Sequence, residues 1–174
     1  MEDRPAARRL HRQAGSSWLE FAVAAVVLSV LAAVLIPALL AYQELAEKAV
    51  VELTIMNMRT GMRFRIAELI LAGRTREVGA LVDSNPVAFL ERPPAGYLGE
   101  FEAVADPESV SPGAWYFDRA TRELVYRVNW GSGFNAQDNG PKVIKLKVVP
   151  RYGSNLKGAL LGVALVASNR YDWQ

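Results

Sequence analysis

Residues 15–41 read GSSWLEFAVAAVVLSVLAAVLIPALLA. After Glu20 no charged side chain occurs until Glu44. As a helix, the run from Phe21 to Ala41 would span roughly 30 Å, about the thickness of the hydrocarbon core of a bilayer. A carboxylate at the edge of hydrocarbon is costly unless a partner meets it. This stretch therefore predicts a membrane segment and a specific role for Glu20.

A short basic leader precedes the apolar run. Its four arginines outnumber its two acidic residues, so residues 1–15 carry the whole formal net charge of +2. Lys48 is the first basic residue after the run. This asymmetry predicts a cytoplasmic N-terminus, with the rest of the chain in the periplasm or outside. Because that remainder is neutral, we expect no nucleic-acid partner.

Three interpretations of the segment compete. A removable signal peptide has a core of about 7–15 apolar residues and a small-x-small cleavage site. This core is longer, and Leu39-Leu-Ala41 is a poor site. A plain single-span anchor explains the length, but it does not explain why Gly15, Glu20 and Pro37 occur together.

The third interpretation is a resemblance. A basic leader ending in Gly15, Glu20 as the fifth residue after it and Pro37 within the apolar run resemble the N-terminus of type IV prepilins and type II secretion pseudopilins. Ser16 stands where that family usually has Phe or Met. The resemblance implies cleavage between Gly15 and Ser16 by a membrane prepilin peptidase, followed by N-methylation of Ser16.

The same resemblance implies how Glu20 and Pro37 act in assembly. Glu20 would pair with the new α-amine of an adjoining subunit and fix the axial register of a helical filament. The ring of Pro37 removes one backbone hydrogen bond, which should kink or loosen the helix. The implied partners are the peptidase, identical or related subunits, an inner-membrane assembly platform and membrane lipid.

From Tyr42 onward the helical pattern becomes one-sided, and we expect the helix to run from 18 to 72 with Gly73 as its C-cap. The apolar side chains recur at helical spacing, and this predicts that they lie on a C-terminal sheet. They are Tyr42, Leu45, Ala46, Ala49, Val50, Leu53 and Met56, continued by Phe64, Ala67, Ile70 and Leu71. Glu44, Glu47, Lys48 and Glu52 would then face solvent. We expect Met56, Met58 and Met62 to fill gaps in the core.

Beyond the helix we expect a small head. Residues 74–82 predict a short helical stretch, and Asn85-Pro86 predicts an N-cap with proline in the first turn. Strands are expected at 114–117, 123–129, 142–148 and 160–167.

The fold class is therefore α+β: a long N-terminal helix, with an apolar membrane half and an amphipathic half, packed on a small antiparallel β-sheet head of pilin-like type. The domains are a cleaved leader (1–15), a transmembrane and filament-core helix (16–41), an amphipathic half (42–72) and the head (73–174).

Candidates for chemistry in the head are few. The sequence has no cysteine, and its one histidine, His11, lies in the leader. We therefore expect no enzyme and no cofactor. Asn135, Asp138 and Asn139 are the residues that could supply oxygen ligands to calcium.

A basic stripe follows, and we interpret it as the solvated face of an edge strand. It consists of Lys142, Lys145, Lys147 and Arg151.

The predicted function is that of a structural subunit of a type IV pilus or type II secretion pseudopilus. It would sit in a bacterial inner membrane as a single-pass protein, with its head in the periplasm or exposed outside in a filament. Major pilin, minor pilin and pseudopilin all stay open. The alternative is a single-pass inner-membrane anchor that presents a periplasmic binding domain.

Overall fold

The computed structural model describes residues 18–136, 140–152 and 160–173. The chain divides into two compact units, residues 1–40 and 41–174. Helix α1 (Trp18–Leu71) begins in the first unit and ends in the second, and it continues without a break through Pro37. Gly73 follows with a φ of 69°, and its N–H donates to the carbonyl of Ile70 at 3.0 Å. This left-handed residue ends the helix as predicted.

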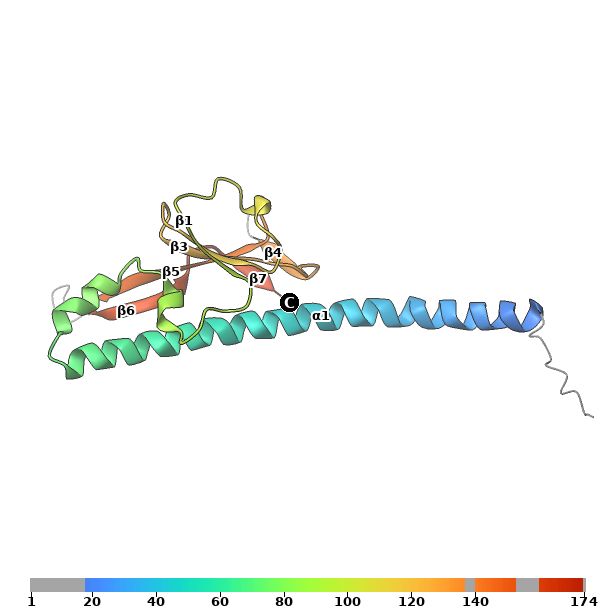
Figure 1. The fold of residues 1–174 in the computed structure, drawn as a ribbon, viewed down its shortest axis with the longest axis horizontal. Coiled ribbons are helices and arrows are strands. Elements are labelled where there is room, and N and C mark those ends of the chain that lie inside the picture. The colour runs from blue at the N-terminus through green and yellow to red at the C-terminus, as the bar shows by residue number, and fades with distance from the viewer. Residues whose placement is uncertain (1–17, 137–139, 153–159, 174) are drawn as a thin grey trace, which may run out of the picture. The chain divides into compact units, whose positions relative to one another are not determined.

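The second unit contains a five-stranded sheet in the order β1-β2-β3-β5-β6 (Figure 1). Its strands are β1 (Tyr97–Phe101), β2 (Trp115–Asp118), β3 (Glu123–Arg127), β5 (Val143–Tyr152) and β6 (Leu160–Ala167). All neighbours are antiparallel except β1 and β2. A separate antiparallel pair joins β4 (Phe134–Ala136) and β7 (Tyr171–Trp173).

Three short 3-10 helices lie in the connections: η1 (Thr75–Leu81), η2 (Pro86–Phe89) and η3 (Pro107–Ser109). The predicted cap of η2 is confirmed, because the Asn85 side chain accepts the N–H of Val87 at 3.0 Å. The chain is thus α+β, with one long N-terminal apolar helix and a mostly antiparallel sheet. The predicted strands are present, whereas β1, β4 and β7 were not predicted.

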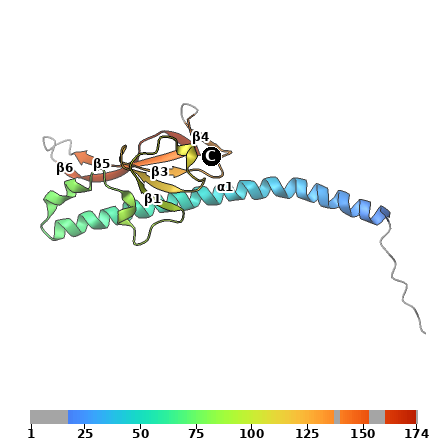
Figure 2. The same ribbon diagram turned by 45° about the horizontal axis from the view of Figure 1, so that its top comes forward.

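The residues of α1 in the second unit pack against one face of the sheet, and Figure 2 shows the helix running along it. Val51, Ile55, Met58 and Met62 of the helix join one core with buried side chains of the strands, including Trp115, Leu124, Tyr126, Ile144, Leu146 and Leu165. On the opposite face of the sheet, Tyr116, Val125 and Val143 form a smaller cluster with Val104 and Val110.

The prediction of which helix face meets the sheet was wrong. Tyr42, Leu45, Val50, Leu53 and Met56 are all more than half exposed, whereas Glu44 is buried. The helix carries two apolar stripes at spacings of three and four residues, and periodicity alone does not tell which one the sheet covers. Of the methionines expected in the core, Met58 and Met62 are buried and Met56 is exposed.

The basic stripe was also misplaced. Strand β5 lies between β3 and β6 and is therefore not an edge strand. Its lysines alternate with buried residues as expected, and both are half-buried. Lys147 lies 3.6 Å from the Asp83 carboxylate and Lys145 lies 4.0 Å from that of Glu123. These contacts explain how a central strand accommodates two ammonium groups.

Candidate functional site: the surface of helix α1 and its junction with the head

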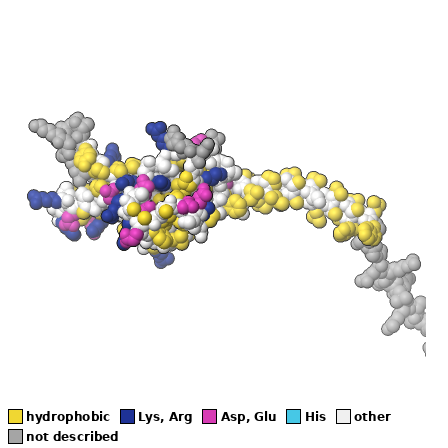
Figure 3. Space-filling view, turned by 90° about the horizontal axis from the view of Figure 1, so that it is seen from above, with side chains coloured by type: hydrophobic (Ala, Val, Ile, Leu, Met, Phe, Trp, Pro, Cys, Tyr) yellow, Lys and Arg dark blue, Asp and Glu magenta, His cyan; other side chains and the backbone are white. Residues whose placement is uncertain are grey.

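The apolar part of α1 is the first candidate site. Every side chain from Trp18 to Gln43 is exposed in the structure. Hydrophobic side chains cover this stretch, whereas Lys, Arg, Asp and Glu gather on the head (Figure 3). By length and composition this is a helix that could cross a membrane, and none of its most apolar window is buried among the described residues. So much exposed apolar surface requires lipid or protein to cover it.

The predicted site residues fall in different places. Glu20 lies in the first turn of α1, and Pro37 lies inside the helix. Ser29, between them, donates its hydroxyl to the carbonyl of Ala25 at 2.7 Å, so its own helix satisfies it. Gly15 and Ser16, the predicted processing site, lie outside the described residues.

The second half of α1 carries an exposed apolar stripe on the side that the sheet leaves uncovered. Its members recur every three or four residues, and the exposed fractions of the large ones range from 51 % at Leu53 to 88 % at Leu71. We call this set the outer stripe: Leu45, Ala49, Leu53, Met56, Thr60, Phe64, Ala67 and Leu71. All of these side chains except Thr60 belong to the face that the sequence had indicated as interacting, and the structure leaves them available to a partner.

The junction between α1 and the head is built on two carboxylates one helical turn apart. We define the helix–loop junction as Glu44, Glu47, residues 129–133 and Trp173. Glu44 is buried, with 7 % of its surface exposed. It accepts the N–H of Gly133 at 2.8 Å, the indole N–H of Trp173 at 3.0 Å and the hydroxyl of Ser132. One acidic side chain thus ties together the loop after β3 and the last strand.

The electrostatics of Glu44 follow from these contacts. Burial acts to raise the pKa of its carboxyl, and the hydrogen bonds from Ser132, Gly133 and Trp173 outweigh that effect. The pKa of Glu44 is therefore held below its ordinary value of 4.5. The side chain is an anion at neutral pH, and the donors that it meets favour that form.

Glu47 continues the junction along the same helix. Its carboxylate accepts the phenol O–H of Tyr126 at 2.7 Å, the N–H of Asn129 at 2.7 Å and the N–H of Trp130 at 2.6 Å. Burial raises the pKa of Tyr126, and the anionic acceptor raises it further, so the phenol keeps its proton. Lys48 completes the arrangement by donating to the carbonyl of Trp173 at 2.5 Å.

Sequence reasoning missed this junction because Glu44, Glu47 and Lys48 were assigned to the solvent face. Their partners lie 79 to 129 residues away in the sequence. No local pattern connects positions so far apart. The sequence did contain two features that could have suggested the junction: two acidic residues at i and i+3 of the helix, and a short loop, residues 129–133, whose N–H and O–H groups could donate to them.

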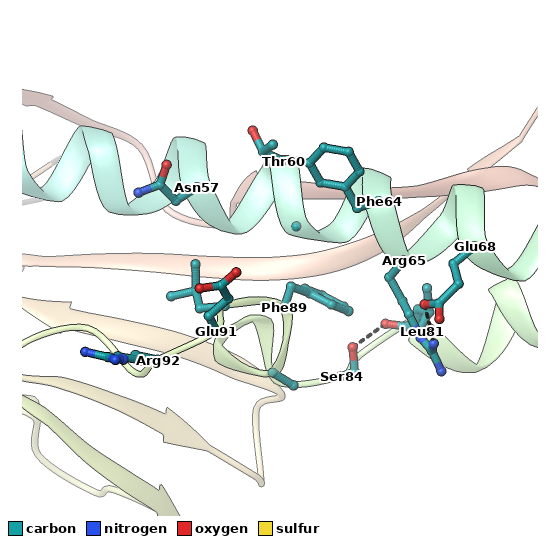
Figure 4. Close-up of a pocket in the computed structure, with 13 residues that line it drawn as sticks. Asn57, Thr60, Phe64, Arg65, Glu68, Leu81, Ser84, Phe89, Glu91 and Arg92 are labelled. Atoms are coloured by element: carbon teal, nitrogen blue, oxygen red, sulfur yellow. Dashed lines mark hydrogen bonds and ion pairs between the residues drawn. The ribbon is translucent and has the colours of Figure 1, made fainter.

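A groove with a volume of about 940 Å³ lies between α1 and the segment that contains η2 (Figure 4). Phe64 of the helix and Phe89 of η2 lie on its two sides, and Arg65 and Glu68 form an ion pair of 2.6 Å at one end. Gly61 permits the close approach, because a Cβ there would lie 2.0 Å from the carbonyl oxygen of Phe89. This groove was not predicted from the sequence.

The calcium candidates are only partly described. Asn135 lies in β4, is exposed and pairs in register with Asp172 of β7. Asp138 and Asn139 lie outside the described residues. Within the described part of the chain, no group of three or more His, Cys, Asp or Glu side chains is arranged to hold a metal ion.

No protein-family model matches this chain, and neither a curated protein nor a solved structure shows significant similarity to it. The function of this chain is therefore inferred from its residues and their arrangement.

Proposed function

We propose that this chain is a pilin-like structural subunit. It would be held in a bacterial inner membrane by the apolar part of α1 and assembled through that helix into a filament of a type IV pilus or type II secretion pseudopilus. The carrying observation is the apolar, fully exposed run that follows Glu20, which itself lies five residues after Gly15. A basic leader, this spacing and Pro37 together support the prepilin type of processing.

The outer stripe supports the assembly part of the proposal. One face of α1 holds the head through Val51, Ile55, Met58 and Met62, and the opposite side remains apolar and exposed. Apolar surface that leaves lipid during extraction needs helices of neighbouring subunits to cover it. A helical array supplies such neighbours through heterologous, non-closing contacts.

The Glu20 carboxylate would set the register of that array. After cleavage, the α-amine of Ser16 has an unperturbed pKa of about 8 and is largely cationic at neutral pH. An opposite charge on a neighbouring subunit offsets a membrane charge that costs about 2.5–3.5 kcal/mol on insertion scales. Setting register is a well-supported use of such buried polar groups.

N-terminal sequencing and intact mass measurement of the membrane-extracted protein test this proposal. We expect a chain that begins at Ser16 and carries a methyl group on its amine. The matched control is a Gly15→Leu variant, in which the leader should remain attached. Native protein that retains Met1 and is nevertheless functional would contradict the proposal.

The groove favours a second candidate, a single-pass anchor that presents a periplasmic binding domain. Its volume of about 940 Å³ is within the range of small-molecule sites, and it combines apolar sides with charged side chains. An anchor predicts that the leader stays on and that subunits do not crosslink through α1. The sequencing experiment therefore separates the two candidates.

A further inference from the structure

The loop that follows β3 holds an exposed tryptophan in a fixed position. The N–H groups of Asn129 and Trp130 both donate to Glu47, so the loop backbone is tied to α1. The Trp130 side chain is 40 % exposed, whereas Trp115 and Trp173, the other tryptophans of this unit, are 3 % and 7 % exposed. The fold thus buries two indoles and presents the third on a constrained loop.

The place of this loop along α1 is set by its tie to Glu47. Glu47 lies six residues beyond Ala41, the end of the apolar run, which corresponds to about 9 Å of helix. The headgroup layer on each side of a bilayer core is roughly 5–8 Å thick. A loop held at Glu47 is therefore tied to α1 about 9 Å of helix beyond the end of the apolar run, a length close to the thickness of that layer. Tyr42, which is 70 % exposed, begins the same interval.

The chemistry of Trp130 suits that layer. Indole is large and apolar but carries one N–H donor, and for this reason Trp and Tyr concentrate at membrane–water interfaces. The charged groups that contact the loop or Trp173 balance in sign: Glu44 and Glu47 are acidic, and Lys48 and Lys142 are basic. The attraction would therefore be to the interface itself and would not require anionic lipid.

We propose that Trp130 inserts into the headgroup layer of the bilayer that α1 spans and thereby holds the head against the membrane surface before assembly. This inference rests on the membrane-spanning part of the proposed function and is independent of the filament. The helix–loop junction fixes the loop, and the loop presents the indole to lipid. Extraction of the subunit from the membrane would then include removal of this side chain from the interface.

Quenching of tryptophan fluorescence by lipid tests the contact. The full chain is reconstituted into phosphatidylcholine vesicles whose lipids are brominated on the upper acyl chain, in a Trp18→Phe background. We expect clear quenching, which the further change Trp130→Phe reduces about threefold or more because the two remaining indoles are buried. Replacing a third of the lipid by phosphatidylglycerol should leave the quenching unchanged. Equal quenching with and without Trp130 would overturn the proposal.

A matched control places an indole elsewhere on the head. Leu161 is 62 % exposed and belongs to β6, the strand that contacts η1 beyond the end of α1. Leu161→Trp, in a protein that lacks Trp18 and Trp130, should show no lipid quenching. Quenching as strong as that of Trp130 would mean that the contact is non-specific and would refute the proposal.

Two further measurements separate failure of the Trp130 contact from failure of the proposed membrane span. Trp18 in a Trp130→Phe chain reports insertion of α1, so absence of its quenching would refute the membrane span and this inference together. A spin label on Asn129→Cys, unique because the chain has no cysteine, avoids any change at Trp130. We expect greater accessibility to oxygen than to a water-soluble nickel reagent, and the reverse order would overturn the inference.

Discussion

The carboxylate of Glu44 accepts the indole N–H of Trp173 at 3.0 Å. This hydrogen bond joins α1 to strand β7, 129 residues later in the sequence. The same carboxylate also binds Ser132 and Gly133. The helix therefore carries the head through a buried polar contact as well as through apolar packing. Removal of a partner from such a contact leaves desolvated groups unsatisfied.

Glu44→Gln should lower the stability of the head by about 1–3 kcal/mol, because an amide offers one acceptor oxygen to donors that now meet two. The measurement is urea unfolding of the full chain in detergent micelles, followed by near-UV circular dichroism of the buried tryptophans. Glu52→Gln is the control, since Glu52 is exposed on the same helix. Equal unfolding midpoints for the two variants would contradict the role assigned to Glu44.

The pH dependence of stability should reflect the same carboxyl. The folded-state pKa of Glu44 lies below its ordinary value of 4.5, so the unfolded state binds the proton more readily. The contribution of Glu44 is then fully present above pH 4.5 and is lost as the pH falls through the folded-state pKa. Unfolding midpoints measured between pH 7 and 3 should fall less steeply in Glu44→Gln than in the parent. Parallel curves would exclude this linkage.

Gly61→Ala should destabilise the protein, although the same change in an ordinary helix interior stabilises by about 0.5–1 kcal/mol. The new Cβ would lie 2.0 Å from the carbonyl oxygen of Phe89, which is backbone and cannot rotate away. We expect a loss of about 1–3 kcal/mol as η2 is displaced. Thr60→Ala, one residue earlier and exposed, is the control and should be nearly neutral. A more stable Gly61→Ala protein would disprove the close packing.

Two neighbouring positions test which face of α1 meets the sheet. Ile55 is 6 % exposed and lies in the core, whereas Leu53 is 51 % exposed on the outer stripe. Ile55→Ala should cost about 2–4 kcal/mol, and Leu53→Ala should cost less than about 1 kcal/mol. Thermal unfolding of both variants in micelles provides the comparison. A larger loss of stability from Leu53→Ala than from Ile55→Ala would support the helix face that was predicted from the sequence.

Glu20→Ala should leave cleavage after Gly15 intact yet prevent incorporation into a filament. Loss of a pairing worth about 2–3 kcal/mol would weaken incorporation by on the order of a hundredfold. Processing is followed by N-terminal sequencing, and assembly is followed by the amount of subunit in sheared, pelleted filaments. Ser29→Ala should behave as the parent, since Ser29 bonds within its own helix. Normal filaments from Glu20→Ala would contradict the proposed pairing of Glu20 with the α-amine of a neighbouring subunit.

Local sequence determined the elements of this protein. Uninterrupted apolar residues predicted helix α1, and Gly73 predicted where it ends. Asn85-Pro86 predicted where η2 starts. These predictions succeed because caps and propensities act over a few residues. Alternation of Ile144, Leu146 and Val148 with lysines located β5. Strands β4 and β7 carry three residues each, too few to show a period.

Tertiary structure alone decided which face of α1 is buried and what its carboxylates do. The helix presents two apolar stripes, so periodicity permits either orientation. The choice depends on Trp173 and the loop at 129–133, whose donors meet Glu44 and Glu47 only when the chain has folded back on itself. Burial of a charge is favourable only where several donors converge, and no local pattern in the sequence encodes that convergence.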